Sequence, residues 1–377
     1  MNPVPGLAGR CWFALLVLLP WAGAGLAAGA VPGVGPLKTR HVFLITYDGL
    51  RWQEVFRGAE EALMTKAHGG VRDEAALRRD FWRDTPEARR AALLPFLWST
   101  VVQQGQVWGH TNLGSIAKVS NPHCFSYPGY SELLTGLVDP AIDSNKKIPN
   151  ANTNVIEWVH GRPGFQGRTA VFASWDVFPS ILNRQRSGVF ISAAQEPVAV
   201  SPTPRQELIN TLLQGTTPPW DGVRHDSFTY AAAREHLLEH RPRLMYLAFD
   251  ETDDWQHDGR YDRTLQIARR TDGWIAALWE LVQSLPEYRD QTTFVITTDH
   301  GRGSGLKAWR DHGAKVEGAE YIWLGILGPD TPALGERRNT PLLWQKQVAA
   351  TVALLLGEDF RATVPAAAEP MRALIGR

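Results

Sequence analysis

Short apolar runs, each about the length of one strand, alternate along this chain with stretches of helical character. His41–Tyr47, Leu244–Phe249 and Thr293–Thr298 are predicted to be buried strands. Parallel neighbouring strands need long crossover connections, and the segments between these runs are long enough to hold helices. The pattern predicts an α/β fold in which a mostly parallel central sheet is covered by helices on both faces.

Further strands are expected at residues 106–110, 169–173 and 321–327. The predicted helices are Leu93–Gln104, Ser131–Val138, Asn152–His160, Asp226–His240 and Thr264–Leu285. The last of these carries apolar residues at spacings near 3.6, which is typical of an amphipathic helix. Because no internal repeat or clear linker interrupts the pattern, residues 31–377 are expected to form a single domain with loop insertions.

The first thirty residues have the pattern of a secretory signal peptide. Arg10 precedes the apolar run Cys11–Leu19, and a small-residue stretch ends in Ala28-Gly29-Ala30. The sequence therefore predicts residues 1–30 to be a signal peptide and the protein to be exported, periplasmic or secreted. An uncleaved anchor helix is the alternative, but Pro20 and the glycines suit a membrane span poorly, and no stable membrane anchor is expected after cleavage.

Charge and cysteine content exclude several classes of protein. Lys+Arg and Asp+Glu both number 39, so no net field attracts nucleic acid, and nucleic-acid binding is not expected. The two cysteines, Cys11 and Cys124, exclude a disulfide-stapled miniprotein and a four-cysteine zinc module. After signal cleavage only Cys124 remains, so stability must come from the core or from metal.

Acidic residues and histidines follow the predicted strands. Asp48 follows the first, Asp253 and His257 follow the strand 244–249, and Asp299-His300 ends the strand 293–298. His312 lies slightly further on. Ligands of open parallel sheets bind beyond the carboxyl ends of the strands, so these side chains are candidate metal ligands. Turn chemistry is the alternative for Asp48-Gly49 taken alone.

Ser126 precedes an extended, proline-containing turn that leads into a helix. A hydroxyl at such a junction lies near free backbone N–H groups and the positive end of the helix dipole. A helix cap is the alternative role, whereas an adjacent dication would make Ser126 a nucleophile without a histidine base.

His236-Leu-Leu-Glu-His240 matches an inverted zinc-protease motif, but a solvated helix end explains it better.

Five short segments are informative when they are taken together in their order along the chain: Tyr47–Trp52, Ser126–Pro128 with Leu134–Gly136, Glu251–His257, Thr298–Gly301 and Asp311–Gly313. Together they resemble the alkaline phosphatase superfamily, particularly its nucleotide pyrophosphatase/phosphodiesterase-like branch. The resemblance extends over residues 41–330. It implies an alkaline phosphatase-like metallohydrolase that acts on a small phosphate-ester substrate, either a monoester or a diester.

The resemblance also implies roles for individual residues. Two sets of three side chains correspond to two sites for divalent metal ions, and these are Asp253, His257 and His312, and Asp48, Asp299 and His300. Ser126 corresponds to the nucleophile that forms a phosphoseryl intermediate. Asn145 lies near the place of a phosphate-binding asparagine. Imidazole and carboxylate ligands suit zinc, with manganese or magnesium as alternatives.

The chain departs from the family pattern at several positions. The diesterase branch usually has Thr in place of Ser126 and Asn in place of Gly129. The arginine that monoesterases use to hold phosphate is not evident, and Arg51, Arg260 and Arg302 are candidates for it. Sulfatase-like hydrolysis is an alternative, although Gly129-Tyr130 replaces the Ser-Arg of the sulfatase maturation motif. Further alternatives are a phosphoglycerate-mutase-like phosphotransferase and, less favoured, a non-catalytic metal- or ligand-binding protein.

Overall fold

The computed structural model describes residues 1–3 and 35–376. Apart from Met1–Pro3, the predicted signal peptide of residues 1–30 lies outside them, as does Cys11. Among the described residues, no helix has the length and apolar character needed to span a bilayer.

Strand β1 (His41–Tyr47) lies inside the central sheet, and all of its residues are buried. Its side chains alternate between two cores. Val42 and Leu44 belong to the hydrophobic cluster on one face, whereas Phe43 and Ile45 belong to the cluster on the other. This alternation explains why the run is apolar almost throughout, because a strand covered on both faces has no polar side.

The central sheet has eight strands and is mostly parallel. In spatial order they are β10 (Gly335–Glu336), β2 (Gln106–Trp108), β9 (Leu324–Leu327), β7 (Thr292–Thr298), β1, β6 (Leu244–Phe249), β4 (Thr169–Ala173) and β5 (Phe190–Ala193). β1 pairs in parallel with β6 and β7, and β4 pairs in parallel with β6 and β5. β9 runs antiparallel to both of its neighbours. The predicted fold class is confirmed.

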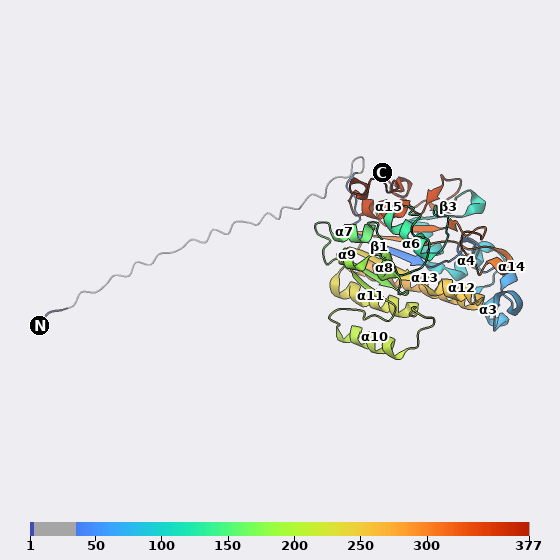
Figure 1. Ribbon diagram of the computed structural model, residues 1–377, viewed down its shortest axis with the longest axis horizontal. Helices are drawn as coiled ribbons and strands as arrows, with labels where there is room; N and C mark the ends of the chain where they lie inside the picture. Colours follow the sequence, from blue (N-terminus) through green and yellow to red (C-terminus); the bar gives the residue numbers. More distant parts are fainter. Residues whose placement is uncertain (4–34, 377) are drawn as a thin grey trace.

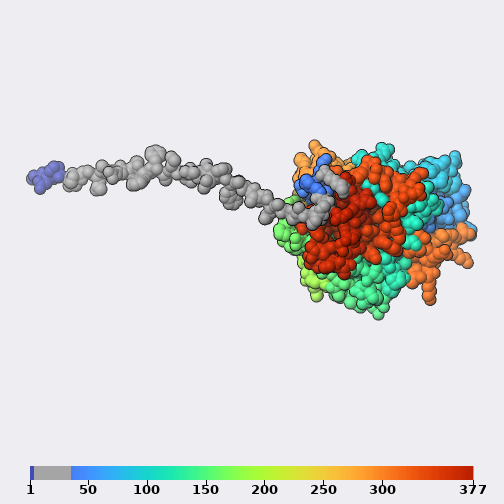
Figure 2. All heavy atoms as spheres, turned by 90° about the horizontal axis from the view of Figure 1, so that it is seen from above, coloured from blue at the N-terminus to red at the C-terminus, as the bar shows by residue number. Residues whose placement is uncertain are grey.

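Helices cover both faces of this sheet (Figure 1). α6 (Ser126–Thr135), α7 (Val155–His160) and α15 (Gln347–Leu355) pack on the face of Val42 and Leu44. In the view from above, the C-terminal segment covers much of this side (Figure 2). α11 (Asp226–His240) and α13 (Tyr261–Ser284) pack on the other face, and α10 (Pro204–Gly215) lies outside α11.

A second, three-stranded sheet consists of β11 (Leu343–Trp344), β3 (Ala117–Lys118) and β8 (Tyr321–Ile322). The sequence predicted one strand at 321–327, but the chain changes sheets at Trp323, so β8 and β9 are separate. The other notable difference is the start of α6, which is Ser126 rather than Ser131. Pro128 lies in the first turn of this helix, where a missing N–H breaks no helical hydrogen bond.

Glu336 in the edge strand β10 joins the sheet to α4 (Pro86–Leu93). Its Oε1 accepts hydrogen bonds from Arg90 Nη1 at 2.7 Å and from His110 Nδ1 at 2.6 Å. Burial alone would raise the pKa of Glu336, but the bonds from His110 and Arg90 outweigh it and lower the pKa to about 2. A carboxyl whose pKa falls on folding stabilises the fold above its ordinary pKa and loses that contribution as pH falls.

We therefore expect Glu336→Gln to lower the free energy of unfolding by about 2 kcal/mol at pH 7. The difference from wild type should shrink as the pH falls from about 4.5 toward about 2, because Glu336 becomes protonated in that window. Urea denaturation at a series of pH values measures it. Glu87→Gln, an exposed change on α4, serves as the control. A difference that does not vary with pH would contradict the prediction.

Candidate active site

Three neighbouring strands of the central sheet end level with one another. Tyr47, the last residue of β1, pairs with Phe249 at the end of β6 and with Thr298 at the end of β7. Candidate ligands follow each strand. Asp48 comes directly after β1 and Asp299-His300 directly after β7, whereas Asp253 and His257 lie on α12 (Glu251–His257), which begins two residues after the end of β6. The parallel register therefore brings residues from distant parts of the sequence to one edge of the sheet.

Asp48, Asp299 and His300 form the deeper group of ligand-type side chains. His300 Nε2 lies 3.4 Å from Asp48 Oδ1 and 3.4 Å from Asp299 Oδ2. One ligand atom from each residue falls within 4.8 Å of the others, and all three side chains are buried. The structure thus brings together the three residues that the family resemblance assigns to one metal site.

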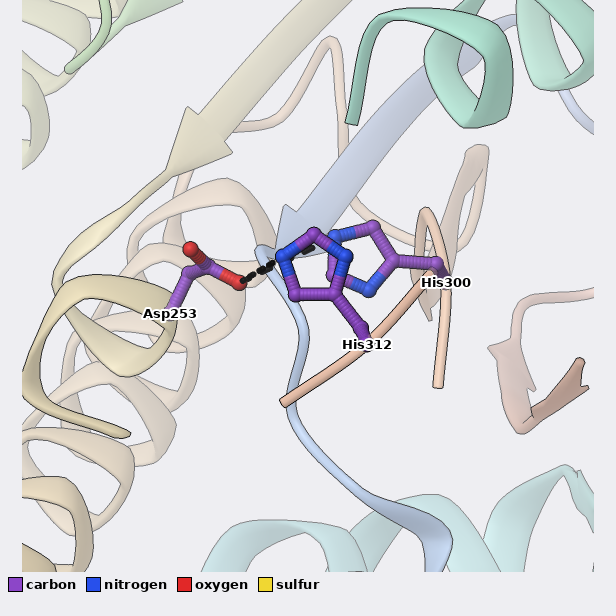
Figure 3. A group of neighbouring side chains, drawn as sticks. All are labelled: Asp253, His300 and His312. Carbon is purple, nitrogen blue, oxygen red and sulfur yellow. Dashed lines mark ion pairs between the residues drawn. The ribbon is translucent and has the colours of Figure 1, made fainter. Parts of the chain in front are cut away.

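Asp253, His257 and His312 form the adjacent, more accessible group. Asp253 Oδ2 lies 3.1 Å from His257 Nε2, which lies 2.9 Å from His312 Nε2. Figure 3 shows that the Asp253 carboxylate also faces His300, and Asp253 Oδ1 lies 3.7 Å from Nε2 of both His300 and His312. The rings of His300 and His312 stack at 4.0 Å. His300 therefore lies between the two groups, and all six candidate ligands form one continuous cluster.

Hydrogen bonds to the backbone orient two of the imidazole rings. His300 Nδ1 lies 2.9 Å from the Gly301 carbonyl oxygen, and His312 Nδ1 lies 3.1 Å from that of Cys124. A ring that donates its Nδ1–H in this way presents an unprotonated Nε2, the arrangement typical of metal-binding histidines. Burial, together with the neighbouring His300, lowers the pKa of His312 to about 2, so its ring is neutral.

The electrostatics of the cluster also fit divalent cations. Burial and the charge of Asp253 raise the pKa of Asp48 well above its usual value, and burial and Asp48 do the same for Asp299. Asp48 Oδ1 and Asp299 Oδ2 are buried without a hydrogen-bond partner in the described residues. Burial would also raise the pKa of Asp253, but Arg302, His257 and His312 together outweigh it and lower that pKa. Unpaired carboxylate oxygens facing imidazole nitrogens form a donor set that suits zinc.

Helix α6 places Ser126 against this cluster. Ser126 is the first residue of the helix, and its Oγ lies 3.4 Å from His300 Nε2. One turn later, the Tyr130 hydroxyl donates a hydrogen bond to Asp48 Oδ2 at 2.9 Å. Between them, a Cβ added at Gly129 would lie 2.5 Å from the carbonyl oxygen of Asp299. The absence of a side chain at Gly129 therefore allows the helix to contact the turn at Asp299 directly.

This packing explains why Gly129 departs from the family pattern, since the asparagine expected there has no space. Asn145 supplies an amide from another direction. It is exposed, and its Oδ1 accepts a hydrogen bond from the Tyr127 N–H at 3.0 Å. The sequence predicted free N–H groups near the Ser126 hydroxyl, but Asn145 accepts the hydrogen bond of the Tyr127 N–H and Pro128 has no N–H. The N–H of Ser126 itself remains without an acceptor among the described residues.

The three candidate phosphate-binding arginines are all engaged within the fold. Arg51 is buried, pairs with Glu54 and donates to the Gly303 carbonyl at 3.2 Å. Arg260 pairs with Asp262 at 2.9 Å. Arg302 is buried and pairs with Asp253. The sequence signalled neither the Arg302–Asp253 pair nor the role of Tyr130, although Tyr130 lies four residues after Ser126 on the same helix face.

The protease-like motif lies apart from this cluster. The ring of His236 contacts Phe172 at 5.2 Å and stacks on Phe190 at 5.4 Å. His236 is only 8% exposed, so the predicted solvated helix end is wrong for this residue. α11 begins at Asp226, which contacts Asp250 beyond the end of β6, and His236 lies three turns away. Its burial against aromatic rings indicates a packing role.

Comparison with known proteins agrees with this geometry. A family model described as type I phosphodiesterase / nucleotide pyrophosphatase matches residues 68–310. This range is more than half of the chain and includes Ser126, Asp253, His257, Asp299 and His300, whereas Asp48 and His312 flank it. No curated protein sequence matches the chain.

Solved structures share the fold at low sequence identity. A phosphonate monoester hydrolase from Silicibacter pomeroyi aligns with a TM-score of 0.55 and 12% identity, over 90% of this chain and 77% of that chain. The lipoteichoic acid synthase LtaP from Listeria monocytogenes aligns with a TM-score of 0.55 and 10% identity, over 88% and 77%. A 2-O GAG sulfatase aligns with a TM-score of 0.55 and 12% identity, over 90% and 74%.

We expect Gly129→Ala to disturb the site, because the added methyl group collides with the backbone at Asp299. The free energy of unfolding should fall by about 1–3 kcal/mol, and zinc affinity should fall by about tenfold or more. Denaturation and zinc titration of the metal-free protein measure the two effects. Gly273→Ala on α13 is the matched control, since nothing lies within 4 Å of an added Cβ there. Equal behaviour of the two variants would contradict the prediction.

Proposed function

The chain belongs to the type I phosphodiesterase / nucleotide pyrophosphatase family, within the alkaline phosphatase superfamily of hydrolases, and from that premise we propose that it hydrolyses phosphate esters with two divalent cations and a phosphoseryl intermediate on Ser126. The observation that carries the proposal is the position of the Ser126 hydroxyl, 3.4 Å from a histidine that lies between two groups of candidate ligands. A serine that only capped the helix would not need to lie beside these candidate ligands.

Two sets of residues would hold the cations. One set is Asp253, His257 and His312, and the other is Asp48, Asp299 and His300. We propose zinc as the metal because half of these donors are imidazoles, and manganese or magnesium are alternatives. When bound, the two cations lower the pKa of a nearby hydroxyl and stabilise negative charge on the entering and leaving oxygens.

The protein's own groups position and react with the substrate. Ser126 Oγ forms a bond to phosphorus as the bond to the leaving alcohol breaks, and water then cleaves the phosphoseryl bond and restores the hydroxyl. The free N–H of Ser126, at the positive end of the α6 dipole, suits a non-bridging phosphate oxygen. The Asn145 amide makes no described hydrogen bond through Nδ2, and we propose that this group donates to the substrate.

The pairing of the three candidate arginines with carboxylates affects whether monoesters or diesters are the better substrates. A monoester carries a second negative charge that a free guanidinium would stabilise, but Arg51, Arg260 and Arg302 are all paired with carboxylates. We therefore propose that small phosphodiesters are preferred to monoesters. The two remaining reactions, sulfate-ester hydrolysis and mutase-like phosphotransfer, are distinguished by assay. We also propose export, on the basis of the signal pattern in residues 1–30, and no nucleic-acid partner.

We expect the purified protein, supplied with zinc, to hydrolyse bis-p-nitrophenyl phosphate faster than p-nitrophenyl phosphate or p-nitrophenyl sulfate. A chelator should abolish turnover, and restoring zinc should recover it, because the site depends on the cations. Release of p-nitrophenolate measures all of these rates. A faster rate on the sulfate ester would favour the sulfatase-like alternative, and absence of turnover on all three would favour a non-catalytic binding protein.

Ser126→Ala should reduce kcat by at least about a thousandfold while two zinc ions still bind, because the change removes the nucleophile but none of the proposed ligands. Steady-state kinetics and metal analysis of the same preparation give both values. Ser131→Ala, a buried change one and a half turns further along α6, is the control and should retain activity. A near-wild-type rate in the Ser126 variant would leave this serine as a helix-terminus residue only.

A further inference from the structure

The loop that precedes α6 makes a contact with the metal-ligand cluster that does not involve its side chains. The backbone carbonyl of Cys124 accepts the hydrogen bond of His312 Nδ1 at 3.1 Å. Cys124 has a φ of 50°, a left-handed conformation that is uncommon outside glycine. This conformation turns the carbonyl toward His312, so the surrounding structure must stabilise it.

Asn121 supplies that stabilisation. Its Oδ1 accepts hydrogen bonds from the N–H of His123 at 3.1 Å and from the N–H of Cys124 at 3.0 Å. Its Nδ2 donates to Glu132 Oε2 at 2.8 Å. Asn121 is 5% exposed, so its polar atoms have little access to water. The amide therefore fixes the turn at Cys124 from one side and is itself fixed from the other.

Glu132 is a fully buried carboxylate on α6, the same helix that begins at Ser126. It accepts hydrogen bonds from the backbone N–H groups of Ser120 and Asn121, each at 2.8 Å, and from that of Lys346 at 3.2 Å. The Ser120 hydroxyl also donates to it, at 2.7 Å. No ion pair to Glu132 occurs within residues 35–376. A buried carboxylate without an ion pair depends on such hydrogen bonds. The bonds to Glu132 therefore fix the position of the loop against α6.

We propose that Asn121 is a positioning residue for His312, and that Glu132 holds Asn121 in place. Through the turn at Cys124, Asn121 directs a carbonyl group at His312 Nδ1, which leaves His312 Nε2 directed at Asp253 and His257. The proposal rests on the proposed function, in which His312 is a metal ligand. It adds a physical link between helix α6, which carries the nucleophile, and the ligand that lies furthest along the chain.

The test is zinc titration of the metal-free protein without substrate. For Asn121→Ala we expect the affinity of one of the two zinc equivalents to fall by about 10–100-fold, because partners that orient metal ligands have effects of that size. The other equivalent should change little. The cobalt-substituted protein provides a second readout, since its visible absorption at the affected site should change with the ligand geometry.

Asn150→Ala is the matched control. Asn150 is also a buried asparagine that contacts α6, donating to Ser131 Oγ at 3.0 Å, but it has no bond to the 120–124 loop. It should lose a similar amount of stability and bind both zinc equivalents normally. Equal weakening in the two variants, or no weakening in Asn121→Ala, would overturn the positioning role.

A double-mutant cycle with His312→Ala separates positioning from general destabilisation. If Asn121 acts through His312, adding Asn121→Ala to His312→Ala should cause no further loss of zinc affinity, and an additive loss would overturn the proposal. Glu132→Gln keeps the shape of that side chain and should weaken the same equivalent, which keeps the test decisive if Asn121→Ala does not fold. If the wild-type protein binds no zinc, the proposed function fails first, and that outcome is distinct from all of these.

Discussion

Negative charge confined at a buried edge of the sheet is the constraint around which this structure is organised. Asp48 and Asp299 are almost inaccessible to solvent, and Asp253 lies beside them. Carboxylates placed so closely raise one another's pKa and oppose their own ionisation. A buried guanidinium, that of Arg302, pairs with Asp253. Bound cations would balance this negative charge, and the imidazoles beside the acids would provide further ligands for them.

Helix α6 is the element that adapts the fold to this cluster. Ser126 and Tyr130 face the candidate ligands, and Gly129 permits contact between the helix backbone and Asp299. On its other side, Leu133 and Leu134 enter the hydrophobic core, so the helix cannot move without disturbing that packing. Glu132 connects the helix to the loop before it. The position of one hydroxyl is therefore set by core packing, by hydrogen bonds and by close backbone contact together.

Much of the fold and the grouping of the candidate ligands could be predicted from the sequence, because both follow from local patterns. The apolar runs at β1 and β6 have the length and composition of buried strands, and the level ends of parallel strands bring Asp48 and Asp299 together. The family resemblance supplied the division into two ligand sets.

The remainder depends on contacts that no local pattern encodes. Pro128 suggested an extended turn, whereas tertiary packing places it in the first turn of α6. Neither the pairing of Arg302 with Asp253 nor the burial of His236 against Phe190 can be deduced from spacing, because each joins residues from separate elements. The left-handed turn at Cys124 could not be predicted from the sequence either, since cysteine has no preference for that conformation.

The proposed ligands are distributed over most of the chain, from Asp48 after the first strand to His312 beyond β7. Because these residues come together only when β1 is paired with both β6 and β7, cations held by the full set would bind the assembled sheet and not the unfolded chain. Ions that recognise only the finished cluster stabilise the native state against every partly opened form. Since Cys124 is a free cysteine, no disulfide among the described residues would share this restraint on the strand ends with the ions.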